Sequence, residues 1–218
     1  MISHAKGGKI SQVSRYEELP EGAVPISPDD VLLFQLERLK NWKNGSEVWP
    51  LTKGAGICAA STVVSGVLTN NHFRKQFNLR YFGRTSGYLM VVCVPTIVTF
   101  LLHTTLVTRR ILVADFTCPT CLLTKSSILQ ALNGAVYPSV ISPIMCIIQA
   151  KKYLTSPIEP TKRIGDTVKV IARTAIPFKG FILLSILSNM AVGMYITRLE
   201  MDTFLNVLMK KDKNKELE

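Results

Sequence analysis

Four long segments of this 218-residue chain contain no aspartate, glutamate, lysine or arginine. They are residues 54–71, 85–108, 126–150 and 180–197, and all 41 charged side chains lie in the other 133 residues. A soluble helix needs a polar face towards water, so such segregation is difficult to reconcile with a soluble globule. About 20 consecutive apolar residues cross the hydrocarbon core of a bilayer as a helix. The sequence therefore predicts an all-α protein, an integral membrane four-helix bundle.

The four predicted spans differ in composition. Residues 85–108 and 126–150 are rich in large apolar side chains, whereas residues 54–71 are rich in glycine, alanine, serine and threonine. Small residues let two membrane helices approach closely, so residues 54–71 either cross the bilayer packed on other helices or form a re-entrant segment. Three amide side chains lie inside spans and are expected to bond across helices: Gln130, Asn133 and Asn189.

The predicted four-span region, residues 53–198, is flanked by segments of different character. Residues 1–26 contain no apolar run and are expected to be a flexible N-terminal segment. Residues 199–218 are expected to form a charged C-terminal tail.

Residues 27–52 are predicted to hold an amphipathic interfacial helix. Ser27 suits the N-cap and Pro28 the first helical position, and Leu32, Leu36 and Leu39 follow at helical spacing. This N-terminal helix is expected to lie on the membrane surface or on a partner, or alternatively against the protein's own bundle.

The basic residues, which give the chain a net charge of +11, are concentrated in two of the three connections between spans. Residues 72–84 and 151–179 carry eleven lysines and arginines against two acidic residues. The middle connection, residues 109–125, carries three basic residues and one acidic residue. Basic loops stay on the cytosolic or matrix side, so the termini and the middle connection are predicted to face the opposite side. Because these charges flank apolar spans, nucleic-acid binding is not expected.

Cys118 and Cys121 form a Cys-Pro-Thr-Cys motif in the middle connection. This spacing is typical of redox motifs, and thiols at a helix N-terminus have lowered pKa values. A redox enzyme normally carries the motif in a βαβ domain, for which this chain has no room. A structural disulfide and a pair of reduced thiols are the two main interpretations.

The sequence contains no motif that predicts catalysis. We find no phosphate-binding loop, no nucleophile elbow and no metalloprotease motif. The predicted spans hold no acid or base apart from His103 near one span end, which argues against proton or ion transport. We therefore expect no catalytic, cofactor-binding or metal-binding residues, and no enzymatic activity.

Several short motifs follow one another in a fixed order along the chain. Residues 70–79 read NNHFRKQFNL and close the first span. The cysteine pair is followed by TKS, then by GAVYP at 134–138 and AKKY at 150–153. In this order the motifs resemble the transmembrane protein 126 family of the inner mitochondrial membrane. The resemblance covers about residues 48–198 and agrees with four spans.

The resemblance implies a non-enzymatic role in assembling respiratory complex I (NADH:ubiquinone oxidoreductase). Family members hold membrane-arm intermediates and dock matrix assembly factors, including an acyl-CoA-dehydrogenase-like factor and intermediate-associated protein 30. The basic loops 72–84 and 151–179 would then face the matrix. The termini and the Cys118–Cys121 loop would face the intermembrane space, where cysteine pairs can be oxidised.

Under that interpretation, aromatic and basic side chains of the two basic loops are candidates for contact with a partner or with membrane lipid. The candidates are Phe73, Arg74, Lys75, Lys151, Lys152, Tyr153, Lys162 and Arg163. The alternative function is a four-span adaptor or scaffold protein of the secretory pathway with a lumenal disulfide. That protein would carry a glycan at Asn44, within the sequon Asn44-Gly45-Ser46.

Overall fold

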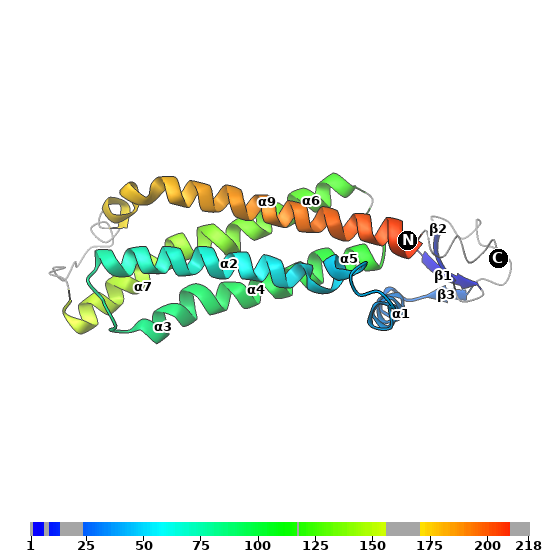
Figure 1. Ribbon diagram of the computed structural model, residues 1–218, viewed down its shortest axis with the longest axis horizontal. Coiled ribbons are helices and arrows are strands. Elements are labelled where there is room, and N and C mark those ends of the chain that lie inside the picture. Colours follow the sequence, from blue (N-terminus) through cyan, green and yellow to red (C-terminus); the bar gives the residue numbers. More distant parts are fainter. Residues whose placement is uncertain (1, 7–8, 14–23, 117, 156–170, 210–218) are drawn as a thin grey trace.

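The computed structural model describes residues 2–6, 9–13, 24–116, 118–155 and 171–209. Four helices are long and apolar enough to cross a membrane: Trp49–Gln76, Arg84–Leu112, Pro119–Tyr153 and Ile171–Met209. They lie side by side in an elongated bundle (Figure 1). The predicted all-α, four-span architecture is therefore confirmed, and each helix extends beyond its charge-free segment at both ends.

Short π-helical turns occur inside the second and third spanning helices and at the end of the fourth. The first spanning helix is α2, Trp49–Gln76. The second comprises α3 (Arg84–Tyr88), a π-turn (Leu89–Cys93), α4 (Val94–His103), a π-turn (Thr104–Thr108) and α5 (Arg109–Leu112). The third comprises α6 (Pro119–Ala131), a π-turn (Leu132–Val136) and α7 (Tyr137–Tyr153). The fourth includes a 3₁₀ turn (Ile176–Phe178), α9 (Lys179–Thr203) and a π-turn (Phe204–Met209).

Two of these π-turns come just before Pro95 and Pro138. Proline has no N–H, so a carbonyl in the preceding turn lacks its usual helical donor. The hydroxyl of Ser65 on α2 donates to the carbonyl of Gly134, four residues before Pro138. A neighbouring helix thus satisfies the group that proline leaves free, as membrane helices with internal prolines require.

Helix α1 (Pro28–Lys40) packs against one end of the bundle. The Ser27 hydroxyl accepts a 3.2 Å bond from the Asp30 N–H, as the capping pattern predicts. Leu39 is buried in the apolar cluster at this end, and Arg38 donates to the Leu208 carbonyl at 3.1 Å. Of the locations left open by the sequence, the structure shows α1 against the protein's own bundle.

A small antiparallel sheet precedes α1. Strand β1 (Ile2–Lys6) pairs with β2 (Lys9–Val13) and with β3 (Val24–Ile26), in the order β2-β1-β3. The sequence predicts a flexible segment over residues 1–26, because it contains no apolar run. The strands are three to five residues long, and strands of this length do not require such a run, so its absence did not exclude them.

The fourth helix also extends further than the sequence predicted. Residues 199–209, assigned above to the charged tail, are helical. Met201, Phe204 and Leu208 point into the same apolar cluster that holds α1. Burial of these side chains makes this stretch part of the bundle, although charged residues separate them from the apolar span in sequence.

The middle of the bundle is polar inside and apolar outside. Its buried polar side chains include Thr62, Ser65, Thr99, Gln130 and Asn189. Its exposed large side chains include Val64, Leu68, Ile97, Leu101 and Leu184. A water-soluble bundle has the opposite arrangement, whereas lipid favours apolar side chains outside and polar contacts between helices.

Apolar clusters close the two ends of the bundle. One includes Leu39, Leu51, Ile111, Leu122 and Phe204. The other includes Phe73, Phe77, Leu79, Ile147 and Ala150. The polar interior of the bundle therefore lies between two apolar clusters.

Candidate functional site in the membrane-spanning bundle

Gln130 on α6 is the centre of a buried hydrogen-bond network. Its amide nitrogen shares its hydrogens among the Cys58 carbonyl at 2.8 Å, the Ser61 hydroxyl at 2.7 Å and Asn189 Oδ1 at 3.2 Å. Helices α2, α6 and α9 are thereby joined at one point. The expectation that Gln130 and Asn189 bond across helices is confirmed, whereas the bond recorded for Asn133 goes to the Leu129 carbonyl of its own helix.

An open groove of about 410 Å³ lies between α2 and α9, beside this network. Its polar residues are Ser61, Ser65, Ser185, Ser188 and Asn189. Its apolar residues include Val64 and Leu184, which are 60% and 63% exposed. The groove therefore presents small polar groups between large apolar ones, a composition that suits another membrane helix.

Ser185 has an unused hydrogen-bonding group in this groove. The side chain is 5% exposed, and its hydroxyl has no hydrogen-bond partner among the described residues. Leaving a buried hydroxyl unpaired costs about 1–3 kcal/mol. A polar group of a molecule seated in the groove would remove this cost, so Ser185 is a candidate contact.

Glu200 and His103 form a second buried polar pair, between α9 and α4. His103 Nε2 lies 3.2 Å from Glu200 Oε1, and the Thr108 hydroxyl donates to the same oxygen at 3.1 Å. Glu200 is fully buried. Gly54 makes room for it, because a Cβ atom there would lie 2.7 Å from Glu200 Oε1.

Glu200 is not among the residues predicted from the sequence, because the fourth charge-free segment ends at residue 197. The spacing of residues along α9 does indicate that Glu200 is buried. Small and polar residues recur every three or four positions along α9 and are all buried: Ser185, Asn189, Gly193, Thr197 and Glu200. Such a stripe indicates one interior face that continues past the apolar segment.

Phe73 and Arg74 are not surface contacts, contrary to the prediction. Phe73 is fully buried and Arg74 is 5% exposed. The Arg74 guanidinium donates to Gln149 Oε1 at 3.1 Å and to the carbonyls of Arg80 and Phe82 at 2.8 and 2.9 Å. Arg74 thus holds the connection between α2 and α3 against α7. Its side chain is buried in this role, so Arg74 does not dock a partner directly.

The other candidate contacts lie at the same end of the bundle. Lys75, Lys151, Lys152 and Tyr153 are exposed, and Tyr153 stacks on Phe82 at 5.3 Å between ring centroids. Lys162 and Arg163 lie outside the described residues. The exposed cations at this end also include Arg80, Arg84, Arg173 and Lys179. We call this the basic end.

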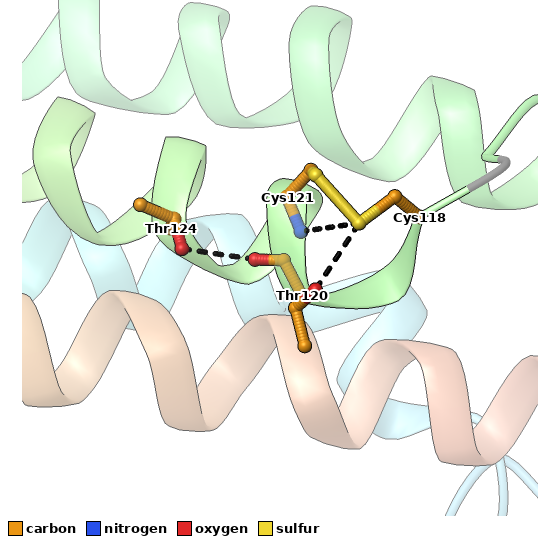
Figure 2. The surroundings of a disulfide bond; sticks show 4 residues. All are labelled: Cys118, Thr120, Cys121 and Thr124. Carbon is orange, nitrogen blue, oxygen red and sulfur yellow. Dashed lines mark hydrogen bonds between the residues drawn. A yellow bond between two sulfur atoms is a disulfide. The ribbon is translucent and has the colours of Figure 1, made fainter.

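Cys118 and Cys121 are joined by a disulfide at the start of α6, at the opposite end of the bundle from the basic end (Figure 2). Cys118 is the N-cap residue, and its sulfur accepts from the Cys121 N–H at 3.2 Å. Within the described part of the chain, no three histidine, cysteine, aspartate or glutamate side chains are grouped so that they could hold a metal ion.

The comparison with known proteins agrees with the family resemblance. A family model described as "Transmembrane protein 126" matches residues 36–214. The protein "Transmembrane protein 126" of Drosophila melanogaster is 36% identical over 140 residues, which cover 64% of this chain and 63% of that protein. "Transmembrane protein 126A" of Mus musculus is 24% identical over 132 residues, covering 61% of this chain and 67% of that protein.

The chain thus covers just under two thirds of the Drosophila relative. No solved structure matches it. The names of these relatives state no enzymatic activity. Because the family model covers most of the chain, including all four spanning helices, this protein belongs to the transmembrane protein 126 family.

Proposed function

We propose that this protein is a non-enzymatic assembly factor of the inner mitochondrial membrane that holds membrane-arm intermediates of respiratory complex I. The groove between α2 and α9 is the observation that carries the proposal. It combines an unpaired Ser185 hydroxyl with exposed Val64 and Leu184, in the middle of a bundle whose outer face is apolar. The occupant is a transmembrane helix of a complex I subunit that presents a hydrogen-bonding residue to the groove.

The basic end supplies a second contact under this proposal. Lys75, Lys151 and Lys152 are exposed there, next to the buried apolar cluster that contains Phe73. We propose that this end faces the matrix and attracts acidic surfaces of matrix assembly factors. The positive-inside rule supports this orientation, because residues 72–84 and 151–179 carry eleven lysines and arginines, whereas the middle connection, residues 109–125, carries three.

A photo-crosslinking side chain at Val64 tests the groove. We expect it to capture membrane-arm subunits of complex I in mitochondria that are assembling the complex. The matched control carries the same group at Ile97, which is 58% exposed on α4 and does not line the groove. Equal capture of those subunits from both positions, or from neither, would contradict the groove as the binding site.

Filling the groove should weaken this capture. In Ser185→Leu, the larger side chain displaces the partner helix and removes a hydroxyl whose interhelical bond is worth about 1 kcal/mol, so capture should fall about fivefold. Ala191→Leu is the control, because Ala191 is exposed on α9 outside the groove. Complex I assembly, followed by native gel electrophoresis, should slow with the first variant and proceed normally with the second.

Charge reversal tests the basic end separately. Lys75→Glu together with Lys152→Glu should reduce co-purification of matrix assembly factors while the Val64 crosslink is retained. Lys40→Glu, an exposed position on α1 at the other end, provides the control. Recovery of the matrix factors that is unchanged by the double reversal would show that they do not dock through these lysines.

A further inference from the structure

We propose that Cys118 and Cys121 form a thiol–disulfide exchange site, which passes two electrons to or from a cysteine pair of another molecule. This activity goes beyond the proposed assembly function and does not depend on it. Four features of the structure support it: the small loop that the disulfide closes, its exposure, the hydrogen bonds to Cys118, and the open surface beside Cys121.

The disulfide is poorly placed to stabilise the fold. It joins residues three apart, with Cα atoms 5.3 Å from each other, at the start of a single helix. The stabilisation that a disulfide provides by restricting the unfolded chain is smallest for the shortest loops. This bond does not connect α6 to another element, so structural need does not explain it.

The motif is accessible from outside the bundle. Pro119, Thr120 and Cys121 are exposed, and Cys118 is partly exposed. An open, mostly apolar surface of α6 borders Cys121, with Lys125 and Ile128 among its residues. Exchange requires a second sulfur to reach the motif, and this surface allows that approach.

The surroundings of Cys118 favour a thiolate once the disulfide is reduced. The Thr120 hydroxyl lies 3.1 Å from Cys118 Sγ, and the Cys121 N–H donates to it at 3.2 Å (Figure 2). Contacts with Cys121, with the Thr120 hydroxyl and with the Cys121 N–H lower the pKa of the Cys118 thiol to about 7. The thiolate is the nucleophile in exchange, so Cys118 is the attacking residue.

The exchange is balanced in two steps. The Cys118 thiolate attacks one sulfur of the partner's disulfide, that bond breaks, and the other partner sulfur leaves as a thiolate and takes a proton from water. Cys121 then loses its proton to water and attacks Cys118 Sγ, which forms the intramolecular disulfide and releases the second partner sulfur. The partner gains two electrons and the motif loses two. The reverse sequence oxidises a partner dithiol.

Glutathione is the probe for the test, with the full-length protein in detergent. Cys121→Ser, treated with oxidised glutathione at pH 7, should gain one glutathione at residue 118, because the resolving thiol is absent. Cys118→Ser should react much more slowly at residue 121. Both variants carry Cys93→Ser, which removes the free cysteine that is exposed. Similar rates in the two variants would overturn the assignment of Cys118.

The unmodified motif tests the site itself. Titration with mixtures of reduced and oxidised glutathione should convert Cys118–Cys121 between its two forms, detected as the number of thiols that react with maleimide. A disulfide that stays intact in a large excess of reduced glutathione in the folded protein would overturn the exchange proposal and leave a structural bond.

Thr120 provides a variant that keeps both cysteines. Thr120→Val removes the hydroxyl beside Cys118 Sγ, and a rise of about one unit in the pKa of that thiol would slow its alkylation by iodoacetamide at pH 7 about fivefold. Thr124→Val is the control, because the Thr124 hydroxyl donates to the Thr120 carbonyl at 2.9 Å rather than to Cys118 Sγ (Figure 2). Equal alkylation rates in the two threonine variants would contradict the proposed activation of Cys118.

Discussion

At the scale of single residues, the bundle depends on buried polar groups that have a partner on another helix. Glu200 is fully buried, next to His103 from α4 and Thr108 from the following π-turn. Removing one partner of a buried pair is costly, because it leaves the other without compensation. The position of Glu200 therefore makes it a strong determinant of how α9 packs on the second spanning helix.

We predict that Glu200→Ala destabilises the bundle by about 3 kcal/mol, because His103 and Thr108 both lose their partner. Glu200→Gln keeps one side-chain oxygen for the Thr108 hydroxyl and should cost markedly less. The measurement is unfolding in a titration with denaturing detergent, followed by circular dichroism. Equal stability of both variants and the natural chain would show that the pair contributes nothing to packing.

Arg74 illustrates the same dependence at the basic end. Its guanidinium binds two carbonyls of the turn after α2 and the Gln149 amide of α7. A test of partner docking that replaced Arg74 would therefore disturb the fold as well as the surface. The exposed Lys75 and Lys152 are the positions at which the two effects can be separated.

At the scale of whole elements, close approach of helices is set by glycines at the crossing points. A Cβ atom on Gly134 would overlap Oδ1 of Asn189 on α9. One on Gly193 would lie 2.8 Å from Gln130 Cβ. The Gln130 network, which joins three helices, therefore needs glycine at these two positions.

We predict that Gly134→Ala destabilises the bundle by about 1–3 kcal/mol, the usual cost of overpacking a filled interior. Gly56→Ala is the matched control, because nothing lies within 4 Å of its added Cβ. The control should be neutral, or stabilising by up to about 1 kcal/mol, since alanine has a higher helix propensity than glycine. Thermal unfolding in detergent compares the two, and a more stable Gly134→Ala would contradict the packing described here.

At the scale of the whole molecule, an even number of spans places α1 and the end of α9 together, away from the basic end (Figure 1). The Arg38 bond to the Leu208 carbonyl and the apolar cluster around Phe204 lie at the α1 end. Under the proposed function, the orientation in the membrane depends on which of these two ends faces the matrix.

We predict that a cysteine introduced at the exposed Lys43, which leaves the sequon at Asn44 intact, is labelled by a membrane-impermeant maleimide in intact mitoplasts. A cysteine at Lys152 should be labelled only after the inner membrane is permeabilised. Both are placed in a chain whose native cysteines are serine. The reverse labelling pattern would overturn the orientation, and a glycan at Asn44 would place the protein in the secretory pathway instead.

The spans could be predicted from the sequence because their cause is local. Lipid excludes charge from about 20 residues in a row, and four such segments are visible without any contact being known. Capping of α1 is local too, since Ser27 and Asp30 lie within one turn. The order of apolar segments thus determined the fold class, and the distribution of basic residues gave the predicted orientation.

The interior was decided by tertiary structure, because a periodic segment does not specify which of its faces meets which neighbour. Burial of Arg74, pairing of Glu200 with His103 and the groove at Ser185 each depend on residues far apart in the chain. Phe73 and Arg74 resembled an interfacial anchor in sequence, but the packing of α7 and the turn after α2 covers them. The sequence alone determined a four-span membrane bundle with a basic end, since lipid acts on each segment separately. Which polar groups are enclosed and which remain open to a partner was settled only when the four helices packed together.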